Sequence, residues 1–144
     1  MSVMYCAVLY CAVLYCAKMC VNTLQLQLIC TCTLPQTIEV TILPVDGEGF
    51  LSPEAGSQSL KCNTALVTIM HSNNEVGTIQ PIRLIGEAIS AYNETLRMTP
   101  DMHHEVLFHS DGAQSLGKIL IDVRQENIDL LTIVGHKFGA PKGA

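Results

Sequence analysis

A lysine near the end of the sequence has the surroundings of a reactive amine. Lys137 follows an apolar run and lies in the glycine-rich segment VGHKFGAPKG, residues 134–143. A lysine that follows a buried strand can be desolvated, which lowers its pKa and lets it attack a carbonyl group as a nucleophile. A single lysine in such a place is more often a solvated loop residue. Lys137 therefore needs partners before this chemistry can be assigned to it.

An aspartate is a candidate partner for this lysine. Asp111 lies in the segment FHSDGAQS, residues 108–115, at the end of another apolar run. A carboxylate at the end of a strand can keep a pyridinium nitrogen protonated, which makes a bound pyridine ring a better electron sink. The common alternative is that an aspartate after a strand only caps the next turn or helix. The sequence alone leaves both interpretations of Asp111 open.

Alternating strands and helices are expected to position these two residues. Apolar runs predict strands at residues 65–70, 106–109 and 128–134. Residues 37–43, rich in β-branched side chains, predict a further strand that ends at the turn-rich DGEG segment.

Helical signals lie between the predicted strands. The segment SPE predicts a short helix with Ser52 as N-cap and Pro53 in the first helical position. A longer helix is predicted to begin at Pro81 and to end near residues 99–101, and residues 113–116 predict a brief helical turn. Apolar side chains on the longer helix recur at steps of three and four, which places them on one face. They are Ile82, Ile85, Ile89, Tyr92 and Leu96.

This alternation is typical of an α/β fold with a parallel sheet. In such sheets the ligand lies beyond the carboxyl ends of the strands. Polar side chains gather at those ends: Asn73 and Asn74 after the first strand, Asp111 after the second, and His136 and Lys137 after the third. The sequence therefore predicts that amides, a carboxylate and an amine face a shared pocket.

Composition narrows the class of protein. The chain has 144 residues, 49% of them hydrophobic and 15% charged, with a formal net charge of -5. One domain of this length can bury a sizeable core. The eight lysines and arginines are scattered singly, which argues against a nucleic-acid partner. High apolar content with small net charge excludes intrinsic disorder.

The first 32 residues differ from the rest of the chain. The segment YCAVL occurs at residues 5–9 and again at 10–14, and six of the seven cysteines lie before residue 33. A period of five matches neither a helix nor a strand. A signal peptide and a membrane span are alternatives, but no basic segment precedes the apolar run and the run is short for a span. We expect a low-complexity repeat at 1–32 outside the fold, a partial domain at 33–144, and no membrane partner.

The cysteines do not form a recognisable metal or disulfide pattern. Cys16 and Cys20 alone have a zinc-like spacing, and no second pair of ligands follows them. We expect no metal site. From residue 33 onward the chain has the cysteine usage of a reduced, cytosolic protein.

Three sequence blocks resemble the class V, pyridoxal-phosphate-dependent enzymes of the cysteine desulfurase and selenocysteine lyase group. The blocks occur in the family's order: MHSNNEVG at residues 70–77, HSDGAQSLGK at 109–118, and GHKF at 135–138 with PKG at 141–143. Weaker similarity extends back to about residue 37. The resemblance implies the central part of the large domain of a fold-type I enzyme, with a mostly parallel sheet and flanking helices.

The resemblance also implies roles for five residues toward pyridoxal 5'-phosphate. Lys137 matches the lysine that bonds covalently to the cofactor. Asp111 matches the carboxylate that pairs with the pyridine nitrogen, while Gln114 and Asn74 match amides that hydrogen-bond the phenolic oxygen. His136 matches a histidine that helps to hold the phosphate. His71 does not match the family's ring-stacking histidine, and we expect it to be an ordinary loop residue beside Asn73.

Two features favour selenocysteine lyase within this group. Val134 stands where desulfurases commonly have a serine, and residues 98–105 form a longer connection than desulfurases usually have. The activity implied is the breakdown of L-selenocysteine to L-alanine, with selenium released or passed to an acceptor protein. The alternative is a cysteine desulfurase that takes sulfur from L-cysteine for iron–sulfur clusters or thiolation.

Family enzymes are much longer and typically homodimeric. They carry a loop cysteine, an arginine for the substrate carboxylate and a further small domain, none of which has a match here. We therefore expect an incomplete chain that is inactive alone. A third interpretation is that the chain is a non-catalytic truncated remnant.

Overall fold

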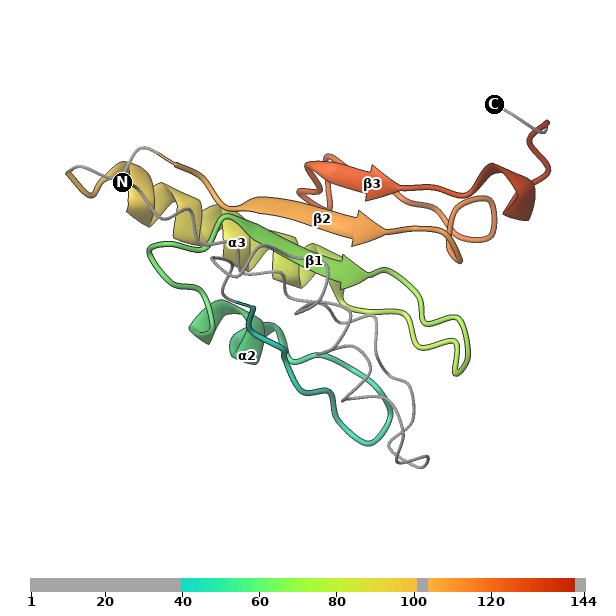
Figure 1. Ribbon diagram of the computed structural model, residues 1–144, viewed down its shortest axis with the longest axis horizontal. Helices are drawn as coiled ribbons and strands as arrows, with labels where there is room; N and C mark the ends of the chain where they lie inside the picture. The colour runs from blue at the N-terminus through green and yellow to red at the C-terminus, as the bar shows by residue number, and fades with distance from the viewer. Residues whose placement is uncertain (1–39, 101–103, 142–144) are drawn as a thin grey trace.

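Parallel strands backed by helices form the regular part of residues 40–100 and 104–141, the residues that the computed structural model describes (Figure 1). The elements in chain order are helix α2 at Pro53–Gln58, strand β1 at Leu66–Met70, helix α3 at Ile82–Arg97, strand β2 at Leu107–Asp111, strand β3 at Leu130–Thr132 and the 3-10 helix η1 at Gly135–Lys137. The predicted alternation of strand and helix is confirmed.

The strands pair in the order β1-β2-β3, and both pairings are parallel. Thr68 lies beside His109, and Asp111 lies beside both Met70 and Thr132. Successive side chains of a strand point to opposite faces. Val67, Ile69 and Phe108 therefore face the core. Thr68 and His109, which alternate with them along the strands, face the opposite side.

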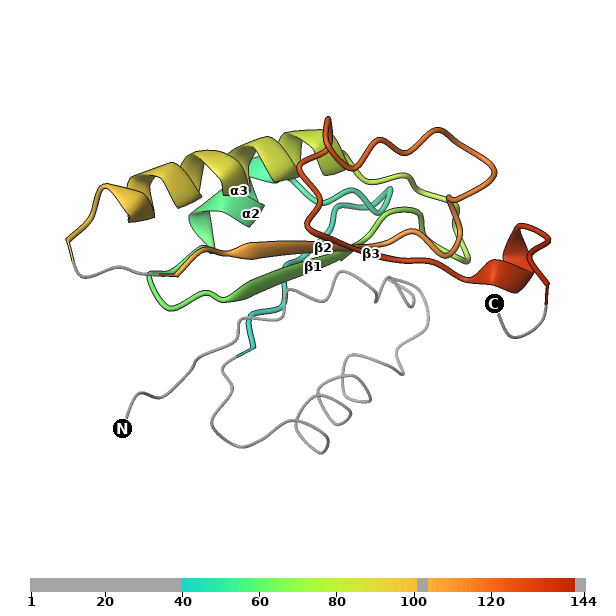
Figure 2. The same cartoon turned by 90° about the horizontal axis from the view of Figure 1, so that it is seen from above.

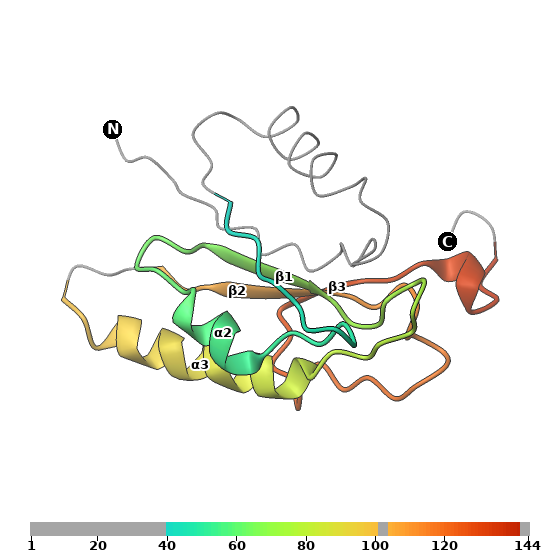
Figure 3. The same cartoon turned by 90° about the horizontal axis from the view of Figure 1, so that it is seen from below.

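Helices α2 and α3 lie on one face of the sheet, as the views from above and from below agree (Figures 2 and 3). Helix α3 presents the predicted stripe to the core. Its members Ile82, Ile85, Ile89 and Leu96 are buried, and Tyr92 packs against the same cluster. Burial of each such aliphatic side chain contributes about 1.5 to 3 kcal/mol, so this stripe is what holds α3 on the sheet.

Helix α2 begins as its sequence predicts. The Ser52 hydroxyl accepts a hydrogen bond from the Ala55 amide at 3.2 Å, and Pro53 occupies the first helical position. A proline fits there because its missing N–H would have had no partner within the helix. The N-cap prediction is confirmed.

Helix α3 is also fastened to its surroundings by polar and close contacts. The Asn93 amide donates to the Val106 carbonyl at 2.9 Å, and its oxygen accepts from the Val106 N–H at 2.8 Å. Near the other end of α3, a Cβ added to Gly86 would lie 2.1 Å from the carbonyl oxygen of Glu126. Glycine therefore permits the loop before β3 to touch the helix backbone.

Two of the predicted strands differ from the structure. Residues 40–43 form no strand, and residues 37–39 of that prediction lie outside the described residues. Leu43 is nevertheless buried in the core, so its apolar character reflects burial without strand pairing. The strand predicted at 128–134 is shorter, at Leu130–Thr132. Thr132 pairs with Asp111, the last residue of β2, so the chain beyond it has no β2 residue left to pair with.

The predicted repeat at residues 1–32 and its boundary lie outside the described residues, and the division at residue 32 stays a prediction. Within residues 40–100 and 104–141, no helix combines the length and apolar character needed to cross a membrane.

Candidate functional site

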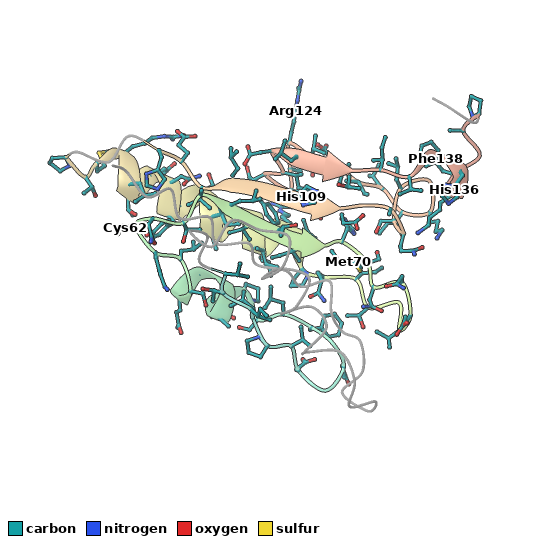
Figure 4. All side chains as sticks on the ribbon, viewed as in Figure 1. Cys62, Met70, His109, Arg124, His136 and Phe138 are labelled. Carbon is teal, nitrogen blue, oxygen red and sulfur yellow. The ribbon has the colours of Figure 1, made fainter. Side chains whose placement is uncertain are left out.

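The carboxyl ends of all three strands meet at one edge of the sheet, on the right in Figure 1. The segment that follows each strand there contains residues of one of the three sequence blocks, at 70–77, 109–118 and 135–143. His136 and Phe138, which follow β3, lie beyond this edge in Figure 4, and Met70 marks the end of β1. The three segments lie at one edge as predicted, but the cleft found there is lined by Asn73 and Asn74 and not by Asp111, His136 or Lys137. This cleft is therefore not the predicted pocket shared by amides, a carboxylate and an amine.

A cleft of about 310 Å³ lies between the segments that follow β1 and β2. Asn74 and Gln114, two of the five predicted cofactor residues, both line it. The full lining is Ser72, Asn73, Asn74, Glu75, Gly77, Ile79, Gln114, Ser115, Lys118 and Ile119. The structure thus brings the two predicted amides together, although they are far apart in the sequence.

The loop that carries Asn74 is shaped by its neighbour. Asn73 is buried, and its side-chain oxygen accepts from the N–H groups of Glu75 and Val76 at 2.8 and 2.9 Å. An asparagine that bonds to the backbone ahead of it forms a tight turn. Asn73 is therefore occupied with the loop itself, which leaves the exposed Asn74 as the amide available to a ligand.

Asp111 occupies the last position of β2 and is partly buried. Its Oδ1 accepts a hydrogen bond from the Ala113 N–H at 2.9 Å, at the start of the predicted turn. That turn is confirmed by the bonds from the Ser115 and Leu116 amides to the Gly112 carbonyl. Asp111 thus caps the turn, and this role occupies one of its two carboxylate oxygens.

Lys137 and His136 lie on η1 at the same edge of the sheet, but they do not line the cleft. Both side chains are exposed, so the desolvation expected for Lys137 is not found among the described residues. The segment is nevertheless in contact with the turn after β2. A Cβ added to Gly117 would lie 2.8 Å from the Cβ of Phe138, so the two backbones approach closely beside Lys137.

Sequence reasoning missed a buried polar cluster at this edge. His71 lies in a loop, as expected, but it is only 4% exposed. Its Nδ1 is 3.0 Å from the Ser115 hydroxyl, which in turn hydrogen-bonds the Ser72 hydroxyl. Two signals were available in the sequence: the polar pair His71 and Ser72, which follows a buried strand, and Ser115 in the second sequence block. Neither signal reveals a contact between residues 44 positions apart.

The remaining chemistry-bearing residues are separate from this edge. Within residues 40–100 and 104–141, no group of three or more His, Cys, Asp or Glu side chains is arranged so that it could hold a metal ion. Cys62 is free and exposed near the opposite end of the sheet (Figure 4). His104 is exposed, and His103 lies outside the described residues.

A parallel sheet with polar groups at its carboxyl edge defines an α/β protein of the kind that binds ligands at that edge. The chain matches the family Aminotransferase class-V over residues 22–144, and it belongs to that family. The match begins upstream of the boundary predicted at residue 32.

Similar proteins and solved structures within this family include cysteine desulfurases and NifS-like proteins. The cysteine desulfurase IscS of Methanosarcina thermophila is 43% identical over 108 residues, which are 75% of this chain and 24% of that protein. A structure described as SspA in complex with cysteine aligns with a TM-score of 0.69 and 31% identity, over 96% of this chain and 34% of the other. A NifS-like protein aligns with a TM-score of 0.70 and 27% identity, over 96% and 33%.

These likenesses establish the fold as the central part of a fold-type I large domain. The chain spans less than a quarter of the length of the Methanosarcina relative.

Proposed function

We propose that this chain is the pyridoxal-phosphate-binding part of an enzyme that removes sulfur from L-cysteine. The observation that carries the proposal is that one cleft at the carboxyl edge of the sheet is lined by both Asn74 and Gln114, next to the strand that ends in Asp111. The names of the relatives, which are cysteine desulfurases, support the substrate.

The side chains at this edge fit pyridoxal 5'-phosphate in their chemistry. They comprise a carboxylate for a ring nitrogen, two amides for an oxygen on the ring, an amine for an aldehyde and an imidazole for a phosphate. When bound, this cofactor supplies an electron sink for negative charge at the α-carbon of an amino acid. The proposed site residues are Lys137, Asp111, Gln114, Asn74 and His136.

Each of these side chains has a definite task in the proposed reaction. Asp111 holds a proton on the ring nitrogen, because a carboxylate beside it favours the charged form. Asn74 and Gln114 donate hydrogen bonds to the phenolic oxygen and fix the orientation of the ring. Lys137 would hold the cofactor through its aldehyde carbon, and its amine would move the proton at the α-carbon of the substrate. His136 donates to the phosphate.

The sequence features and the named relatives favour different substrates. Val134 and the connection at residues 98–105 favoured selenocysteine lyase in the sequence, and part of that connection lies outside the described residues. The relatives found are named for cysteine, so we place cysteine first and selenocysteine second. In either case the other product is L-alanine, and an acceptor takes the sulfur or selenium.

The proposed setting is a reducing compartment such as the cytosol, in a homodimer of the longer protein. The free, exposed thiol of Cys62 supports a reducing environment.

The test is made on the full-length protein and its variants, since the chain covers only part of its relatives' length. We expect an absorbance band from the bound cofactor that disappears in Lys137→Ala. Lys61→Ala is the matched control, because Lys61 is an exposed lysine before β1, at the opposite end of the sheet.

Release of alanine from L-cysteine and from L-selenocysteine then separates the two substrates. Faster release from cysteine supports the desulfurase, and release from selenocysteine alone supports the lyase. A protein with no lysine-dependent band and no alanine release would be the non-catalytic remnant.

A further inference from the structure

A chain of buried hydroxyl and imidazole groups connects the segments that follow β1 and β2. His71 and Ser72 belong to the first segment and Ser115 to the second. They are 4%, 8% and 1% exposed, respectively. Buried polar groups are costly unless they are hydrogen-bonded, and here each one is bonded to another member of the chain.

The far side of the imidazole faces a carboxylate. Nε2 of His71 lies 3.7 Å from Oε2 of Glu126, and neither atom has a hydrogen-bond partner within the described residues. A carboxylate only accepts, so this arrangement favours the tautomer with its proton on Nε2. In the neutral ring Nδ1 is then an acceptor. The Ser115 hydroxyl donates to Nδ1, and the Ser72 hydroxyl donates to Ser115.

This chain of bonds adjoins the cleft that the two amides line. Ser115 is the neighbour of Gln114, and Ser72 is two residues from Asn74. Both serines also line the cleft. The backbone of His71 is itself fixed, because its N–H donates to the Asp111 carbonyl at 2.9 Å and its carbonyl accepts from the Gln80 N–H at 2.9 Å. His71 is therefore a rigid point from which one bond reaches across to the second segment.

We propose that His71 is a positioning residue that holds the Asn74 and Gln114 amides at a common spacing through its bond to Ser115. The proposal rests on the proposed function, in which these amides hydrogen-bond the phenolic oxygen of the cofactor. His71 itself does not line the cleft, so its effect is expected only through the two segments.

Substitutions at His71 separate its hydrogen bond from its volume. In His71→Asn the side-chain amide reaches the place of Nδ1 and can still bond Ser115, whereas His71→Leu fills the space without that bond. Ser115→Ala removes the same bond from the other side with a change of one oxygen atom, and it serves if His71→Leu does not fold. His104→Asn is the matched control, since His104 is an exposed histidine outside the site.

The first measurement needs no cofactor. Amide hydrogen exchange is followed at Ser115 and Leu116, whose N–H groups bond the Gly112 carbonyl at 3.0 and 2.9 Å. We expect exchange about tenfold faster in His71→Leu and Ser115→Ala, the effect of losing one buried hydrogen bond. His71→Asn and His104→Asn should stay within about threefold of the unmodified protein. Amides of the strands serve as internal controls.

The second measurement compares two ligands of the purified full-length protein, pyridoxal 5'-phosphate and its 3-deoxy analogue, which lacks the phenolic oxygen. Misplaced amides should weaken binding of the first by about tenfold and leave binding of the second unchanged. A merely structural role for His71 would weaken both equally.

The outcomes distinguish the two proposals. The inference is overturned if Ser115→Ala leaves exchange unchanged, or if the variants lose affinity for both ligands alike. If the unmodified protein binds neither ligand, the proposed function fails, and the exchange rates alone then decide whether His71 joins the two segments.

Discussion

Replacement of Gly117 by alanine tests whether the turn after β2 positions the segment that carries Lys137. Gly117 has a φ of +81°, where a side chain costs about 1 to 2 kcal/mol. The added Cβ would also lie 2.8 Å from the Cβ of Phe138, against an ordinary carbon–carbon separation of about 3.5 to 4.0 Å. The clash is with atoms next to the backbone, so a rotamer change of Phe138 cannot relieve it.

Phe138 or the turn must therefore move by about 0.7 Å or more, at a further cost of about 1 to 3 kcal/mol. Gly139→Ala is the matched control, because Gly139 has nearly the same φ, +83°, with nothing within 4 Å of an added Cβ. We expect Gly117→Ala to lose about 2 to 5 kcal/mol of the free energy of unfolding and Gly139→Ala about 1 to 2. Urea unfolding followed by circular dichroism measures both.

The same displacement should reach Lys137, which is adjacent to Phe138. A misplacement of about 1 Å can slow a reaction by about a hundredfold, so the lysine-dependent absorbance band should form more slowly in Gly117→Ala. Combining Gly117→Ala with Phe138→Gly removes the clashing Cβ, and the stability cost of the alanine should fall to that of the control. Equal costs for Gly117→Ala and Gly139→Ala would refute the contact as a positioning device.

Three further predictions concern stability. Gly86→Ala should destabilise the fold by about 3 kcal/mol or more in urea unfolding, because its Cβ would lie 2.1 Å from a backbone carbonyl oxygen, and no measurable loss would contradict that approach. Asn93→Ala should cost about 2 to 4 kcal/mol, because it leaves both the N–H and the carbonyl of the buried Val106 without the partners they now have; a loss below about 1 kcal/mol would mean that other groups replace the amide. Burial and the negative charge of the Cys62 thiolate raise the pKa of Tyr92 above 10.0, because both disfavour the tyrosinate. The contribution of the neutral Tyr92 to the free energy of unfolding is therefore fully present below pH 10 and declines as the pH rises through the higher pKa of the folded state. Tyrosinate absorbance, taken as a difference from Tyr92→Phe, should show this tyrosine titrating at a lower pH in Cys62→Ser.

Helix α3 and the first two strands could be predicted because their signals are local. The stripe from Ile82 to Leu96 repeats at helical spacing over four turns, and one buried face explains all of it. Leu43 shows the limit of such signals. An apolar residue among β-branched neighbours indicates burial. It does not indicate whether another strand will be available to pair with its segment.

The candidate site was predictable in its residue types and only partly in its geometry. Asn74 and Gln114 meet in one cleft because each follows a strand of the same parallel sheet, which the order of elements already implied. The burial of His71 and the contact of Gly117 with Phe138 depend on how two loops cross in space. No periodicity along the chain records such contacts.

The double hydrogen bond between Asn93 and Val106 also bears on the order in which the chain folds. These residues are 13 positions apart, whereas Thr68 and His109, which pair β1 with β2, are 41 apart. Closing the longer loop costs about 1 kcal/mol more conformational entropy than closing the shorter one. The carboxyl end of α3 and the start of β2 should therefore associate first, and this early unit would offer a prepared edge to which β1 is recruited late.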